Sequence, residues 1–135
     1  MDIDNPKCLE MKAFLESIGG FVNGWYPDRP NITDPHFMSI GCGWYPLVQK
    51  LIQDLIDAGW NRRILQVKEK FGGLRFYTDG ASIECYNLID KAEEESYKTC
   101  EECGSKEVVT TGPLEGGYWI RSLCHGCRVM YPSAG

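Results

Sequence analysis

The sequence predicts an α+β domain in which helices pack on a β-hairpin, followed by a C-terminal zinc-ribbon-like module. Apolar residues recur at helical spacing in three segments, and the period changes to alternation around residues 65–77. Four of the seven cysteines form two C-x2-C pairs near the C-terminus. We therefore expect an α+β domain over residues 1–98 and a zinc-ribbon module over residues 99–130 that packs on it.

Length and composition limit the function classes. A chain of 135 residues with 43% hydrophobic and 12% aromatic residues has enough apolar surface for one domain, which excludes a disordered or collagen-like chain. No segment approaches the roughly 20 apolar residues that span a bilayer, and the acidic start argues against a secretory signal. The net charge of −5 disfavours general binding to nucleic acid.

The N-terminal third contains one helix and one long loop. Asn5-Pro6 is typical of a helix start, because asparagine caps the helix and proline fits its first position. Gly19-Gly20 ends the helix. Residues 21–43 show little periodicity and form a loop, or a loop with a short strand. This loop is either functional or held by its aromatic residues, and its prolines are Pro27, Pro30 and Pro35.

Two further helices flank a hairpin. Residues 44–58 form the clearest amphipathic helix, which ends at Gly59. Residues 65–77 form the hairpin, in which alternation places Leu65 and Val67 on the apolar face. Residues 82–98 form the third helix, and the residues expected on its apolar face are Cys85, Tyr86, Ile89 and Ala92.

The cysteine spacing predicts a metal site. The pattern is C-x2-C-x20-C-x2-C, in which two tight turns each direct two sulfur atoms at one ion. Gly104 and Gly126 have the positions at which a positive φ turns backbone N–H groups toward the sulfurs. Residues 108–111 and 118–121 are expected as the two strands between the turns. The predicted ligands are Cys100, Cys103, Cys124 and Cys127.

We expect one structural Zn²⁺ per chain, because four thiolates close the coordination sphere and leave no position for an activated water. The alternatives are a pair of redox dithiols or four buried free cysteines. An odd number of cysteines excludes a fully paired disulfide framework.

Part of the chain resembles a known family. The segment Gly43-Trp44-Tyr45, the stretch 66–77 (QVKEKFGGLRFY) and the two C-x2-C pairs are similar to a largely uncharacterised family of small bacteriophage and prophage proteins. The resemblance covers roughly residues 41–128. It implies a phage-encoded accessory protein in the cytoplasm of a bacterial host, where such proteins often bind a host macromolecule, sometimes a defence component.

Candidate catalytic residues are few. Asp34 and His36 have a spacing that suits acid–base chemistry, but nothing else in the sequence converges on them. Cys42 precedes a helix, whose N-terminus lowers the pKa of a thiol, although a small residue that packs a tight turn is the simpler interpretation. His125 is expected to face solvent between two ligands. Cys8 and Cys85 lie on apolar helix faces and are expected in the core. We therefore expect no enzymatic activity.

A basic hairpin is the better candidate for binding. Residues 61–80 contain five basic and two acidic residues, a net charge of +3. Cations beside Tyr77 on a β-ribbon suit nucleic acid or an acidic protein surface. The alternative is a solvated outer face that pairs with Glu93–Glu95. The basic residues are Arg62, Arg63, Lys68, Lys70 and Arg75.

The loop also offers a candidate contact surface. Trp25 and Tyr26 lie on a proline-stiffened segment, so little entropy is lost when a partner buries them. We expect both rings to be partly exposed and near the basic hairpin; the competing interpretation is that they cap the core.

The first hypothesis for the function is a non-enzymatic zinc protein that binds a host or phage protein. The alternative is a nucleic-acid-binding zinc ribbon that uses residues 61–77.

Overall fold

The computed structural model describes residues 5–114 and 117–130. In chain order, the elements are α1 (Pro6–Ser17), β1 (Val22–Asn23), η1 (Pro35–Phe37), η2 (Cys42–Trp44), α2 (Tyr45–Asp57), β2 (Arg63–Lys70), β3 (Gly73–Thr78), α3 (Ile83–Ser96), β4 (Val109–Pro113), β5 (Ile120–Cys124) and α4 (His125–Met130). The α+β class with a cysteine-rich C-terminal module is confirmed.

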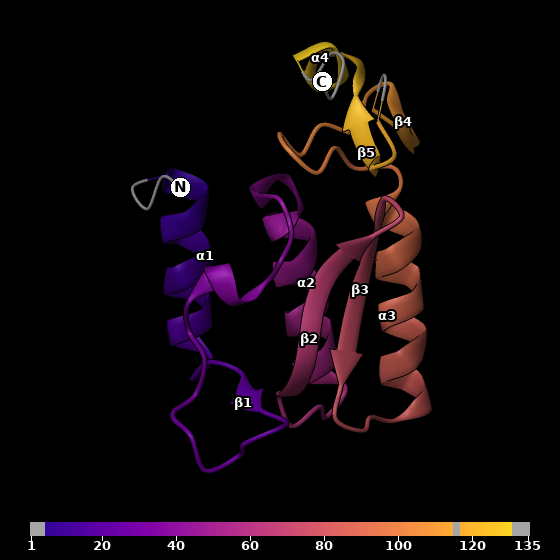
Figure 1. The fold of residues 1–135 in the computed structure, drawn as a ribbon. Coiled ribbons are helices and arrows are strands. Elements are labelled where there is room, and N and C mark those ends of the chain that lie inside the picture. Colours follow the sequence, from indigo (N-terminus) through magenta and orange to yellow (C-terminus); the bar gives the residue numbers. More distant parts are fainter. Residues whose placement is uncertain (1–4, 115–116, 131–135) are drawn as a thin grey trace.

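Helices α1, α2 and α3 lie beside a three-stranded sheet, whereas α4 belongs to the C-terminal module (Figure 1). The strand order is β1-β2-β3, in which β1 is parallel to β2 and β3 is antiparallel to it. The main core contains side chains from α1, α2, α3 and the sheet, and its largest fully buried residues are Trp44, Phe21, Met11 and Leu15. No helix in the described ranges is both long and apolar enough to cross a bilayer.

The first helix begins where its predicted cap indicates, and the third has a cap that was not predicted. The Asn5 side chain accepts a hydrogen bond from Lys7 N at 2.9 Å and caps α1. Ser82 caps α3 in the same way, through Cys85 N. Tyr86 is an exception to the predicted pattern, because 45% of its surface is exposed rather than buried against the core.

The hairpin forms as predicted, but the predicted burial pattern of its first strand was partly wrong. Phe71 and Gly72 both have positive φ, as a two-residue turn between Lys70 and Gly73 requires. The register shifts between Ile64 and Gln66, so Ile64 and Val67 are buried while Leu65 is only half-buried. A bulge of this kind breaks the simple alternation from which Leu65 was placed on the apolar face.

The module forms a second, smaller core at one end of the molecule. Cys100, Leu114 and Leu123 are buried there, around the antiparallel pair β4-β5. Figure 1 shows the module next to the turn between β2 and β3, and the Ser122 hydroxyl donates to Gly72 O at 2.6 Å across this contact.

The strands of the module differ from the expected ranges 108–111 and 118–121. Gly112 and Pro113 belong to β4 rather than to the connection, because the pairing runs from Val109↔Cys124 to Pro113↔Ile120. Tyr118 and Trp119 consequently precede β5 and are exposed.

Candidate metal centre

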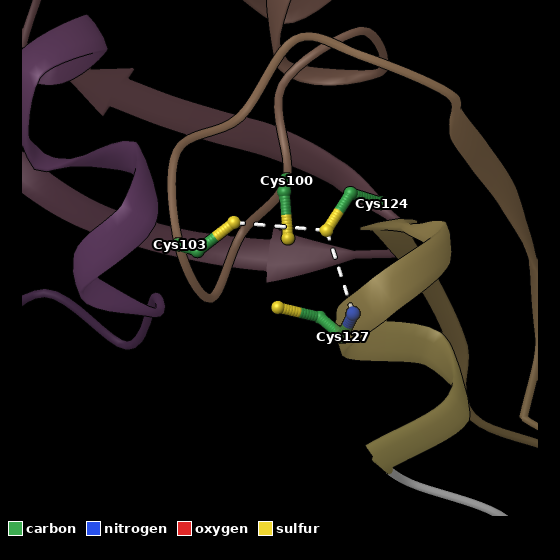
Figure 2. Close-up of side chains that lie close together, drawn as sticks. All are labelled: Cys100, Cys103, Cys124 and Cys127. Atoms are coloured by element: carbon green, nitrogen blue, oxygen red, sulfur yellow. Dashed lines mark hydrogen bonds between the residues drawn. The ribbon is translucent and has the colours of Figure 1, made fainter.

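The four predicted ligands converge at one point. Figure 2 shows the four side chains directed toward a common centre, two from the turn after α3 and two from the junction of β5 and α4. Their sulfur atoms all lie within 4.8 Å of one another. Cys103 Sγ and Cys124 Sγ are 3.7 Å apart. A tetrahedron of Zn–S bonds of about 2.3 Å has edges of about 3.8 Å, so this separation fits a tetrahedral ion.

Backbone geometry forms the first turn. Gly104 has a φ of 83°, and its N–H donates to Cys100 O at 2.9 Å. Ser105 N donates to Cys103 Sγ at 3.5 Å. The predicted role of Gly104 is confirmed, because this left-handed conformation lets the chain reverse so that N–H groups face the sulfurs.

The second turn differs from the prediction. Gly126 has no positive φ, because it lies within α4. Cys124 ends β5 and Cys127 lies one helical turn later, so the helix itself brings the two thiols together. Cys127 N donates to Cys124 Sγ at 3.4 Å. His125 lies between them and is exposed, as expected.

The thiols differ in their electrostatic environment. Burial opposes ionisation of Cys100, but backbone N–H groups of Cys124, Cys103 and Glu102 outweigh it and lower its pKa to about 7. Burial and the neighbouring thiols raise the pKa of Cys127. Backbone N–H groups thus favour the thiolate form of Cys100, and a divalent ion held by the four cysteines would favour the thiolate form of all of them.

The chemistry of four thiolates suits a structural ion. Soft thiolate donors in a tetrahedral set favour zinc or an iron–sulfur centre. Cys100 is fully buried and Cys103 is exposed, so the site lies at the edge of the small core rather than in a cleft. The predicted metal-binding cluster is therefore present in the fold, and it couples the turn after α3 to β5 and α4.

A buried ion pair beside the metal site was not found in the sequence. Arg121 and Glu101 are each 3% exposed, and Arg121 also donates to Glu102 at 2.7 Å. Nothing local in the sequence relates these residues, because 20 positions separate Arg121 from Glu101. Their sequence positions give a weak signal, because Glu101 lies inside the first C-x2-C pair and Arg121 shortly before the second.

The cations of the predicted basic hairpin are mostly engaged within the fold. Arg62 donates to Ile18 O and Gly20 O, both at 2.8 Å, and so closes the C-terminus of α1. Arg63 pairs with Asp79 at 2.8 Å, and Arg75 pairs with Glu93 at 2.6 Å. Within the described ranges, Lys68 and Lys70 form no ion pair.

Both loop aromatics are exposed as predicted, and the predicted position near the hairpin is confirmed for Trp25. Trp25 is 67% exposed and Tyr26 is 55% exposed. The Trp25 indole N–H donates to Leu65 O at 3.1 Å, which places the ring against the hairpin.

Three residues considered for catalysis have different surroundings. Cys42 is half-buried and its closest polar contacts are Glu102 O at 3.7 Å and Asn5 Nδ2 at 4.0 Å. Asp34 and His36 contact each other, and His36 also contacts Cys8. The premise that nothing converges on Asp34 and His36 was therefore wrong, because the fold brings α1 against η1.

Comparison with models of protein families, with curated proteins and with solved structures finds no match. The resemblance to small phage proteins thus stays a prediction.

Proposed function

We propose that the chain is a zinc-stabilised accessory protein of phage type that binds a host or phage protein in the bacterial cytoplasm. The observation that carries the proposal is the fixed, exposed Trp25 ring at the edge of a groove of about 560 Å³. We call this the aromatic groove, and its lining includes Trp25, Leu65, Arg75, Tyr77 and Tyr86.

The groove is organised before any partner arrives. Asn23 Oδ1 accepts hydrogen bonds from the backbone N–H groups of Trp25 and Tyr26, at 2.9 and 3.0 Å. The Arg29 guanidinium lies 3.9 Å from the centre of the Tyr26 ring. Rings held in this way lose little conformational entropy on binding, and tryptophan and tyrosine are enriched among residues that dominate interface energy.

The metal has a structural role in this proposal. Four thiolates fill the coordination sphere, so the ion holds the module rather than reacting. The module in turn packs on the β2-β3 turn, where Trp119 Nε1 donates to Glu69 Oε1 at 2.9 Å. Zinc therefore supports the hairpin that forms one wall of the aromatic groove.

The alternative, a nucleic-acid-binding ribbon, has less support. A protein that binds phosphates presents several cations that are free to contact them. Here Arg62, Arg63 and Arg75 already have partners inside the fold. The two remaining lysines of the hairpin form too small a basic surface for strong binding at physiological salt.

The experiment is affinity capture from bacterial lysate with matched variants. The bait proteins are the wild type, the double variant Trp25→Ala/Tyr26→Ala, and Tyr118→Ala as a control, because Tyr118 is fully exposed and lies in the cysteine module. We expect a protein retained by the wild type and the control to be lost from the double variant. Equal capture by all three baits would contradict the proposed surface.

A further inference from the structure

A second group of reactive side chains lies outside the metal centre. Cys8 Sγ is 3.3 Å from His36 Nε2, and His36 Nδ1 is 3.2 Å from Asp34 Oδ1. A thiol, an imidazole and a carboxylate thus stand in line, each within reach of the next. In enzymes with a catalytic triad, the imidazole activates the nucleophile as its base, and the carboxylate orients the imidazole.

Local structure fixes the imidazole. Asp34 caps η1, because its Oδ1 accepts from His36 N at 2.9 Å, and the same oxygen faces Nδ1 of the ring. A carboxylate beside Nδ1 holds the proton there, so the lone pair of Nε2 faces Cys8. In this tautomer His36 is placed to accept the thiol proton.

The Cys8 thiol also lies near the N-terminus of a helix. Cys8 lies in the first turn of α1, a 12-residue helix, where backbone N–H groups and the helix dipole stabilise negative charge. Tyr45 lines the same pocket as Cys8, and burial, together with the nearby thiol, raises the pKa of Tyr45.

A pocket gives access to these groups. It has a volume of about 580 Å³, and its lining includes Cys8, His36, Tyr45, Glu69, Glu101 and Arg121. Glu102 also lines it, so three carboxylates face one guanidinium. The excess of negative charge disfavours anionic ligands and favours neutral or cationic ones.

We propose that Cys8 is a nucleophile for acyl compounds without negative charge, with His36 as its base and Asp34 as the residue that positions His36. This activity goes beyond the partner binding proposed above. It also departs from the expectation of no enzymatic activity, whose reason was the lack of converging groups.

The reaction consumes only an ester and water. The Cys8 proton passes to His36 Nε2, and the sulfur forms a bond to the carbonyl carbon of an ester. The tetrahedral intermediate expels the alcohol, which leaves with the proton from His36, and a thioester remains on Cys8. Water, deprotonated by His36, then cleaves the thioester, releases the carboxylic acid and restores the thiol.

The first test measures the reactivity of Cys8 in zinc-loaded protein. Iodoacetamide alkylates a thiolate with loss of iodide, and trypsin places Cys8, Cys42 and Cys85 in three different peptides, so each rate is measured by mass spectrometry. We expect Cys8 to react about a hundredfold more slowly in His36→Gln than in the wild type. Cys42→Ser, a change on the wall of the same pocket, should leave the Cys8 rate unchanged.

An internal comparison covers the case in which His36→Gln does not fold. Cys85 is 1% exposed and contacts no imidazole within the described ranges, so it reports the rate for a merely buried thiol. Cys8 that reacts no faster than Cys85 in the folded wild type overturns the proposal. Iodoacetate should react with Cys8 more slowly, relative to iodoacetamide, than it does with a small free thiol; the opposite order contradicts the charge preference.

The positioning role of Asp34 has its own readout. Asp34→Asn keeps an oxygen that caps η1 but removes the charge at Nδ1. Nitrogen-15 spectra of the two histidines should report a proton on Nδ1 of His36 in the wild type and a mixture of tautomers in the variant, with His125 as an exposed reference. Unchanged His36 signals would remove Asp34 from the proposal.

The second test is acyl transfer from 4-nitrophenyl acetate. We expect an acetyl group on the tryptic peptide of Cys8 and release of nitrophenol, both lost in Cys8→Ser and retained in Cys42→Ser. If iodoacetamide alkylates Cys8 rapidly but 4-nitrophenyl acetate does not acetylate it, the proposed acyl chemistry is contradicted. That outcome does not bear on the proposed binding function.

Discussion

Arg121 and Glu101 form a buried ion pair that joins the two halves of the metal module. Arg121 Nη2 donates to Glu101 Oε1 at 3.1 Å, and both side chains are 3% exposed. Glu101 follows the ligand Cys100, and Arg121 lies on β5, which leads to Cys124. Glu101 Oε2 also accepts from Gly41 N at 2.8 Å. The pair therefore connects the module to the segment before α2 as well as to itself.

Replacing Arg121 should be strongly destabilising. Arg121→Met leaves the Glu101 carboxylate buried without its cation, and breaking such a pair costs about 3–5 kcal/mol. Urea unfolding of the zinc-loaded protein measures the change in the free energy of unfolding. The matched control is Arg63→Met, which breaks a pair whose side chains are 37% and 40% exposed and should cost below about 1 kcal/mol.

The double variant separates charge from packing. Glu101→Gln/Arg121→Met removes both charges, so we expect its loss of stability to be smaller than the sum of the two single losses. Additive losses would indicate that each side chain acts through its other contacts rather than through this pair.

Zinc should bind in a one-to-one ratio and stabilise the module. Elemental analysis of protein purified without chelators should give one zinc per chain, and Cys103→Ser should reduce that content. Removing the metal with a chelator should lower the melting temperature, because binding to a folded site contributes folding free energy.

Cys42→Ser is the control for the metal prediction. Cys42 is another thiol close to the module but lies outside the four-cysteine cluster, so its replacement should leave the zinc content unchanged. Protein without zinc, or with a disulfide inside either C-x2-C pair, would contradict a zinc site.

The metal ligands were predictable because their signal is local. Two residues between Cys100 and Cys103 dictate a turn that brings the thiols together, whatever the rest of the chain does. The start of α1 was predictable for the same reason, since Asn5 caps the residues that follow it. The short helix α4 was missed, because its six residues, His125–Met130, are too few to show a helical period.

The groups that depend on tertiary contacts were not predictable. Cys8 and His36 are 28 positions apart and meet because α1 packs against η1. From the sequence, Cys8 is an apolar residue at helical spacing, and periodicity reports burial rather than chemistry. The half-buried Leu65 shows the same limit, because a bulge between paired strands depends on both strands.

The Trp25 ring should contribute little to stability although it is large. Its 67% exposure and its single indole hydrogen bond predict that Trp25→Ala changes the free energy of unfolding by no more than about 1 kcal/mol. Phe21→Ala, in the same loop, is the control, because Phe21 is fully buried and its removal should cost about 3–5 kcal/mol. If Trp25→Ala unfolds the protein instead, the ring belongs to the core and the partner surface must lie elsewhere.

Nucleic acid should bind weakly at physiological salt. A protein that neutralises several phosphates still binds non-specifically at micromolar concentrations. Here, within the described residues, Arg63 and Arg75 are held in ion pairs and Arg62 donates to backbone carbonyls, which leaves Lys68 and Lys70 as the hairpin cations without such a partner. A gel shift with double-stranded and single-stranded DNA should therefore show no retardation at low micromolar protein. Lys68→Glu/Lys70→Glu tests the hairpin, and Lys12→Glu/Lys50→Glu is a control of equal charge change on α1 and α2. Retardation that disappears with the hairpin variant and persists with the control would replace the protein partner with nucleic acid, because it would place the phosphate contacts on β2.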